Sequence, residues 1–243
     1  RGPAYPALIC MMLAATGGWW PGSVQTAQCV LFALVTWMIY RMGQMLAGKR
    51  AGFIAALVFA VYPMPIWFTS RIWVEILAMF LMTAFCLTLM QYLSSPRARI
   101  ALLAGLILGI ATLCKSTFLP FVIIAPLLVA WLSGWKRTAL IIPLTAAVVV
   151  LPWTARNWKV SGHIVPVHVL TGAALLDGDY IVNKFWETPF SYRPQCEKAA
   201  IVWRQLAVEL PPDLRGASYD YALDKAILEN RLGRLPPWSS PSH

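Results

Sequence analysis

Long apolar runs separated by short basic segments make up most of the first 153 residues. Residues 51–70, 100–114, 116–135 and 138–155 contain no charged residue. Hydrocarbon excludes charge, and a helix that crosses a bilayer needs about 20 apolar residues. The pattern therefore predicts an all-α fold, a polytopic membrane helix bundle. The transmembrane helices are expected at about 24–47, 51–69, 74–93, 100–115, 117–133 and 138–153.

An earlier apolar run covers residues 4–20 and ends in two tryptophans followed by Pro21 and Gly22. Paired tryptophans beside a Pro-Gly break are typical of a membrane interface. The pattern leaves open whether this run spans the membrane or lies along its surface.

The sequence changes character after residue 158. Residues 159–243 hold nine of the ten acidic residues of the chain and are rich in Pro, Gly and Asp. We therefore divide the chain into a membrane domain, residues 1–158, and a polar extracytoplasmic segment, residues 159–243. The final Leu-Pro-Pro-Trp-Ser-Ser-Pro-Ser-His is rich in helix breakers, which predicts a disordered end.

The basic residues of the loops predict the orientation. Gly-Lys-Arg (48–50), Ser-Ser-Pro-Arg-Ala-Arg (94–99) and Gly-Trp-Lys-Arg (134–137) alternate along the chain with the sites of Arg71, Lys115 and Arg156. Cytoplasmic loops carry an excess of Lys and Arg. This rule places the first set in the cytoplasm and the second set on the outer side.

Composition agrees with a membrane protein and narrows the functional classes. The chain is 59% hydrophobic and carries a net charge of +10. The basic residues lie in short loops between apolar runs, so the charge points to membrane topology and not to nucleic acid. The three histidines are scattered and the five cysteines have no metal or redox spacing, so we expect no metal site of that kind.

Glu75 is the only acidic residue before Asp177. With the predicted topology, Arg71, Glu75, Lys115 and Arg156 gather at one membrane face, and charge in a membrane domain is a functional hypothesis by default. Several cations at such a face can hold a phosphate or diphosphate head group. A carboxylate among them can orient a hydroxyl, act as a base or bind a metal.

Each of these residues also has a purely structural interpretation. Arg71 and Glu75 are four residues apart, so on a helix they would pair with each other. Glu75 would also be favoured by the dipole at the start of its helix. Lys115 and Arg156 can extend their side chains to the interface, and Trp153 and Trp158 flank Arg156.

Several segments together resemble the GT-C glycosyltransferases, the branch that includes protein O-mannosyltransferases and aminoarabinose transferases of lipid A. Arg-Gly-Pro-Ala-Tyr-Pro (1–6) is similar to the family's Arg-Pro-Pro-Gly-Tyr-Pro segment. Ser-Arg-Ile-Trp-Val-Glu (70–75) resembles its Ser-Arg element with a downstream acid. The helix ending at Lys115, the Pro-Trp-Thr-Ala-Arg-Asn element (152–157) and the Gly-rich stretch 171–179 follow in the family's order.

The resemblance implies transfer of a sugar from a polyprenyl-phosphate donor to a protein, lipid or glycan acceptor outside the cytoplasm. It makes residues 4–20 a juxtamembrane helix and the bacterial inner membrane the expected location. It implies donor-phosphate contacts for Arg1 and Arg71, with Lys115 and Arg156 as further candidates. Glu75 becomes an acid near the acceptor or a divalent metal, although no cofactor is firmly implied.

Two features set the chain apart from the family. The usual catalytic acid lies in an outer loop upstream of the Arg-Gly-Pro-Ala-Tyr-Pro segment, so we expect a fragment that is inactive alone. Arg-Gly-Pro-Ala also replaces Arg-Pro-Pro-Gly.

Two other functional classes stay open: a transporter or flippase of a lipid-linked or anionic substrate, and a non-catalytic membrane scaffold. A transporter would need midplane charges and repeated halves, which the sequence lacks.

Overall fold

The computed structural model describes residues 2–17, 21–133, 137–162 and 165–167, and every element in these ranges is helical. Most of the predicted polar segment 159–243, including its expected disordered end, lies outside the described residues. The elements are α1 (Ala4–Thr16), α2 (Pro21–Ala60), α3 (Pro63–Thr69), α4 (Glu75–Ser94), α5 (Ala98–Cys114), η1 (Ser116–Phe118), α6 (Phe121–Ser133), η2 (Arg137–Leu140) and α7 (Ile141–Ser161). The chain divides into two units, Arg1–Trp153 and Thr154–His243.

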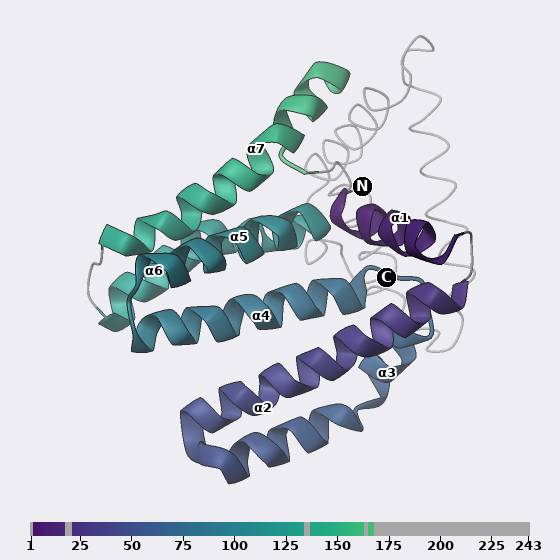
Figure 1. Ribbon diagram of the computed structural model, residues 1–243. Helices are drawn as coiled ribbons and strands as arrows, with labels where there is room; N and C mark the ends of the chain where they lie inside the picture. Colours follow the sequence, from purple (N-terminus) through teal and green to yellow (C-terminus); the bar gives the residue numbers. More distant parts are fainter. Residues whose placement is uncertain (1, 18–20, 134–136, 163–164, 168–243) are drawn as a thin grey trace, which may run out of the picture. The chain divides into compact units, whose positions relative to one another are not determined.

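Helix α2 doubles back on itself, as Figure 1 shows. The backbone leaves helical geometry at Ala47 and at Gly48, where φ is 86° and ψ is 176°. Only glycine adopts that conformation readily. The two arms approach closely beside the turn, because a Cβ atom on Gly43 would lie 2.7 Å from the Cα of Gly52. Small residues thus let the two backbones meet, as they do in membrane helix pairs.

The expected helix 51–69 is two helices in the structure. The second arm of α2 ends at Ala60, and α3 begins at Pro63. A proline disfavours helical geometry in the residue before it, and Tyr62 is accordingly extended, with ψ at 121°. Pro63 therefore ends the continuous helix that the apolar length of this segment predicts.

Helices α4 and α5 are antiparallel neighbours and hold the largest core cluster with residues of α6, η2 and α7. Phe85 and Tyr92 of α4 pack there against Leu108 of α5. The buried Tyr92 hydroxyl lies 2.6 Å from Thr138 Oγ1, which satisfies both polar groups in an apolar interior.

Two glycines on α5 permit close contact with the first half of α7. A Cβ atom on Gly105 would lie 2.5 Å from the carbonyl oxygen of Ile142, and one on Gly109 would lie 2.7 Å from the Cβ of Val149. The Gly-x-x-x-Gly spacing of these two residues thus forms a packing surface.

The apolar side chains on the outside match a lipid environment. Trp131 is 81% exposed and Leu46 is 76% exposed, and many other large apolar residues of the helices are exposed as well. Soluble monomers rarely expose apolar surface on this scale. Three of the described helices are long and apolar enough to cross a membrane, Gly22–Ala60, Glu75–Ser94 and Thr138–Val160, and Ala4–Thr16, Ala98–Cys114 and Ser116–Leu132 are shorter apolar helices. The predicted all-helical membrane bundle is confirmed.

The remaining helix bounds differ from the expected ranges mainly at the ends. The run 4–20 is helical only to Thr16, and 117–133 begins as η1 before α6 starts at Phe121. The run 138–153 begins as η2, and α7 continues to Ser161 through Pro152.

Candidate functional site

Glu75 and Lys115 form an ion pair at one end of the first unit, with 2.9 Å between Glu75 Oε2 and Lys115 Nζ. Glu75 is the first residue of α4 and Lys115 follows the last residue of α5. Two antiparallel helices bring these ends together across 40 positions of sequence. The side chains are 31% and 37% exposed, respectively, so both reach the surface.

Arg71 does not share a helix with Glu75, which corrects the local i, i+4 pair considered from the sequence. It lies in the linker between α3 and α4, and its guanidinium carbon is 5.4 Å from the ring centroid of Trp67. Trp67 in turn meets Trp73 edge to face at 5.3 Å between centroids. A cation–π contact of this kind orients the arginine without neutralising it.

Two glutamines of the first α2 arm hold the linker in place. Gln25 Nε2 donates to the carbonyl oxygen of Ser70, and Gln28 Nε2 donates to that of Trp73, each at 2.9 Å. Sequence reasoning missed both residues. Their signal was two amides three residues apart at the start of a long apolar helix, a spacing that places them on one helix face.

Gln28 also connects the linker to helix α1. It is fully buried, and its Nε2 lies 3.3 Å from the hydroxyl of Tyr5. Its Oε1 is buried and has no hydrogen-bond partner among the described residues. A buried acceptor without a partner is costly.

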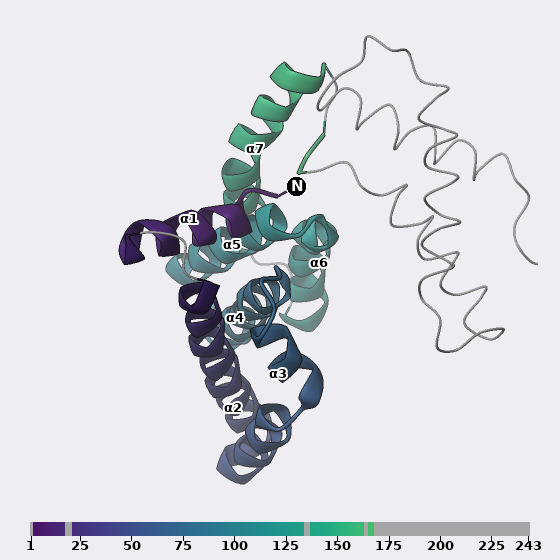
Figure 2. The same cartoon turned by 90° about the vertical axis from the view of Figure 1, so that its right-hand side faces the viewer.

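The amino-terminal segment packs against the same end of the bundle. A Cβ atom on Gly2 would clash with the carbonyl oxygen of Leu113, and Ala4 packs on a cluster that includes Ala78 and Cys114. Figures 1 and 2 both show α1 across the ends of α2 and α5. Glycine is therefore required at position 2, because the backbone there lies against the backbone of Leu113.

We call this group the α4–α5 end site: Tyr5, Gln28, Arg71, Glu75 and Lys115. Arg1, a predicted member, lies outside the described residues. Arg156 is an exposed residue of α7 and belongs to the second unit. The described residues contain no group of three His, Cys, Asp or Glu side chains that could hold a metal ion.

Thr154 and Asn157 of the Pro-Trp-Thr-Ala-Arg-Asn element hold the short segment after α7 by hydrogen bonds. Asn157 Nδ2 donates to the carbonyl oxygens of Val165 and Val167 at 3.0 Å each, and Thr154 Oγ1 donates to that of Pro166 at 2.9 Å. The asparagine of this element therefore fixes the backbone of the segment that follows α7.

The end site lies inside a region that matches a known protein family. The sequence profile described as dolichyl-phosphate-mannose-protein mannosyltransferase matches residues 1–158. No curated protein and no solved structure matches the chain.

Proposed function

The chain belongs to the dolichyl-phosphate-mannose-protein mannosyltransferase family, and we propose that the protein expressed from its complete gene moves a sugar from a polyprenyl-phosphate donor to a hydroxyl acceptor on the extracytoplasmic face. The observation that carries the proposal is the Glu75–Lys115 pair. Glu75 is the only carboxylate among the described residues, and two helices and a glutamine-braced linker position it beside a cation.

The end site supplies the two kinds of group that this reaction needs. The acceptor hydroxyl attacks the anomeric carbon, the bond from that carbon to the phosphate oxygen breaks, and prenyl phosphate leaves with its negative charge. Arg71 and Lys115 are assigned to the phosphate, because cations placed where charge develops stabilise the transition state. Glu75 is assigned to the acceptor side, where a carboxylate can orient or deprotonate the hydroxyl. Arg1 and Arg156 are weaker candidates for donor contacts.

The finer assignments extend the same proposal. The expected location is the bacterial inner membrane, and the acceptor is a protein, a lipid or an envelope glycan. The loops at 48–50 and 94–99 lie on the cytoplasmic side and the end site lies outside, as the distribution of basic residues favours. A divalent metal at Glu75 would need ligands beyond those that the described residues bring together.

The test is sugar transfer by membranes that carry the protein expressed from its complete gene. We expect Lys115→Gln to lower the transfer rate roughly 100-fold, as for loss of one transition-state contact, with unchanged expression. Glu75→Gln and Arg71→Ala should also lower it. Arg97→Gln removes a cation from the loop before α5 and serves as the matched control with normal transfer.

A charge swap separates a site role from a structural one. Glu75→Lys combined with Lys115→Glu keeps an ion pair but exchanges the positions of its charges. We expect this double variant to express normally and to remain inactive. Recovery of transfer would reduce the pair to a structural contact and remove both residues from the proposed site.

A further inference from the structure

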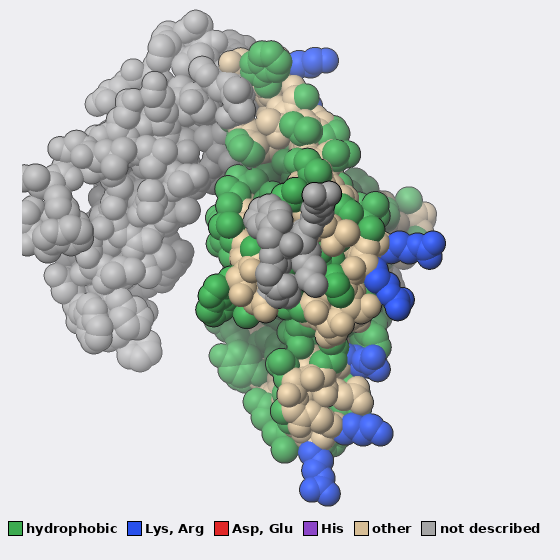
Figure 3. Space-filling view, turned by 90° about the vertical axis from the view of Figure 1, so that its left-hand side faces the viewer, with side chains coloured by type: hydrophobic (Ala, Val, Ile, Leu, Met, Phe, Trp, Pro, Cys, Tyr) green, Lys and Arg blue, Asp and Glu red, His purple; other side chains and the backbone are tan. Residues whose placement is uncertain are grey.

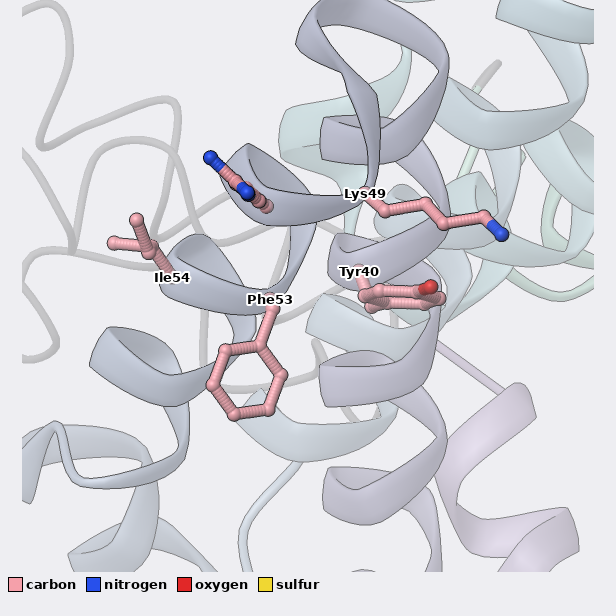
Figure 4. Close-up of a pocket in the computed structure, with 5 residues that line it drawn as sticks. Tyr40, Lys49, Phe53 and Ile54 are labelled. Carbon is pink, nitrogen blue, oxygen red and sulfur yellow. The ribbon is translucent and has the colours of Figure 1, made fainter.

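The turn of α2 forms a second, separate feature: a surface hollow of about 460 Å³ lined by residues from both arms of the helix. The lining residues are Tyr40, Lys49, Arg50, Phe53 and Ile54. Figure 4 shows Lys49 and Tyr40 extending in the same direction, with Phe53 and Ile54 projecting from the second arm. We propose that this hollow binds the head group of an anionic phospholipid.

The charge around the hollow favours an anion. Lys49 and Arg50 supply two adjacent cations to its lining. Glu75, the only carboxylate among the described residues, lies near Gln28, at the other end of the first α2 arm. The helix rise of about 1.5 Å per residue puts Gln28, and Glu75 near it, about 30 Å from the turn. Figure 3 shows Lys and Arg side chains along one side of the face that carries the turn, and no Asp or Glu among the residues it colours by type.

The apolar surroundings favour a lipid over a soluble anion. Phe53 and Ile54 are 62% and 60% exposed, and Leu57 on the same arm is 54% exposed. These side chains continue from the hollow along the outside of the second arm, where acyl chains would lie. Tyrosine and basic side chains at the end of a membrane helix are typical of the head-group level. A phospholipid satisfies both the charged and the apolar part of this surface.

The geometry of the turn creates the hollow. Gly48 reverses the chain, and the contact between Gly43 and Gly52 brings the arms together just inside the turn. Lys49 is thereby placed beside Tyr40 of the other arm, and Arg50 follows it in the lining of the hollow. Clusters of basic residues at such positions recognise anionic lipids, each cation adding to the attraction. This feature is independent of the proposed sugar transfer.

The experiment measures lipid binding to the full chain purified in detergent, by native mass spectrometry with phosphatidylglycerol or phosphatidylcholine. We expect phosphatidylglycerol to bind more tightly, and the double variant Lys49→Gln, Arg50→Gln to weaken that binding roughly ten-fold. The matched control is Arg97→Gln, Arg99→Gln, which removes the same charge from the start of α5 and should bind normally. Lys49→Arg, Arg50→Lys should also bind normally, because it keeps both charges.

Two outcomes would overturn the proposal. Equal binding of the two lipids by the unmodified protein would mean that the hollow has no preference for an anionic head group. Equal weakening by the two neutralised double variants would mean that the effect is one of overall surface charge and not of this hollow.

Discussion

At the scale of single residues, the end site depends on amides that no charge pattern indicates. Gln28 is buried, donates to the backbone of Trp73 and lies beside the Tyr5 hydroxyl. It therefore links α1, α2 and the linker before Glu75. The charged side chains of the end site reach the surface, while Gln28, which holds the linker before Glu75, lies in the interior.

We predict that Gln28→Ala destabilises the protein by about 1–3 kcal/mol, because it leaves the Trp73 carbonyl oxygen without its donor. Transfer activity should fall as well, since the linker carrying Arg71 loses its support. Gln44→Ala, a substitution of the same type on the same α2 arm, is the control. Thermal unfolding in detergent measures the first effect, and equal midpoints for the two variants would contradict the assigned role.

The residues of the site show where sequence reasoning succeeds and where it stops. Glu75 and Lys115 were singled out because charge is rare in apolar sequence, and that argument needs no coordinates. Their pairing with each other depends on the antiparallel contact of α4 and α5, which a local i, i+4 rule cannot see. Whether they act in catalysis remains a prediction.

At the scale of elements, glycine decides how closely the helices meet. The sequence already marks Gly105 and Gly109 as a Gly-x-x-x-Gly pair, but it does not name the partner helix. The structure identifies that partner as α7, with Ile142 and Val149 at the contacts. In lipid, where apolar burial drives association weakly, such close packing is a main source of stability.

We predict that Gly105→Ala separates α5 from α7 and lowers the unfolding midpoint. The added Cβ atom would lie 2.5 Å from the carbonyl oxygen of Ile142, and backbone cannot move aside as a flexible side chain can. Leu102→Ala, at an exposed position of the same helix, should change the midpoint little. An unchanged unfolding midpoint for Gly105→Ala would contradict a close contact between α5 and α7 at this position.

At the scale of the whole molecule, the length of an apolar run predicts that a helix is present but does not predict where that helix is interrupted. Break residues within the apolar runs shape the path of the chain: Gly48 reverses α2, and Pro63 separates α3 from it. The expected ranges 24–47 and 51–69 followed charge and hydropathy. They therefore captured the reversal at the basic turn and missed the uncharged break at Tyr62.

The last prediction concerns the two ends of α4. This helix has 20 residues, so it extends about 30 Å, which matches the hydrocarbon thickness of a bilayer. If it spans, Ser70 before it and Ser94 at its end lie on opposite sides of the membrane, and both positions are exposed. We place each as a single cysteine, Ser70→Cys or Ser94→Cys, in a variant that lacks the native cysteines. In intact cells we expect a membrane-impermeant thiol reagent to label position 70 at once and position 94 only after permeabilisation. Labelling of both positions from one side would mean that α4 does not cross, and the end site would then lose its assignment to the extracytoplasmic face.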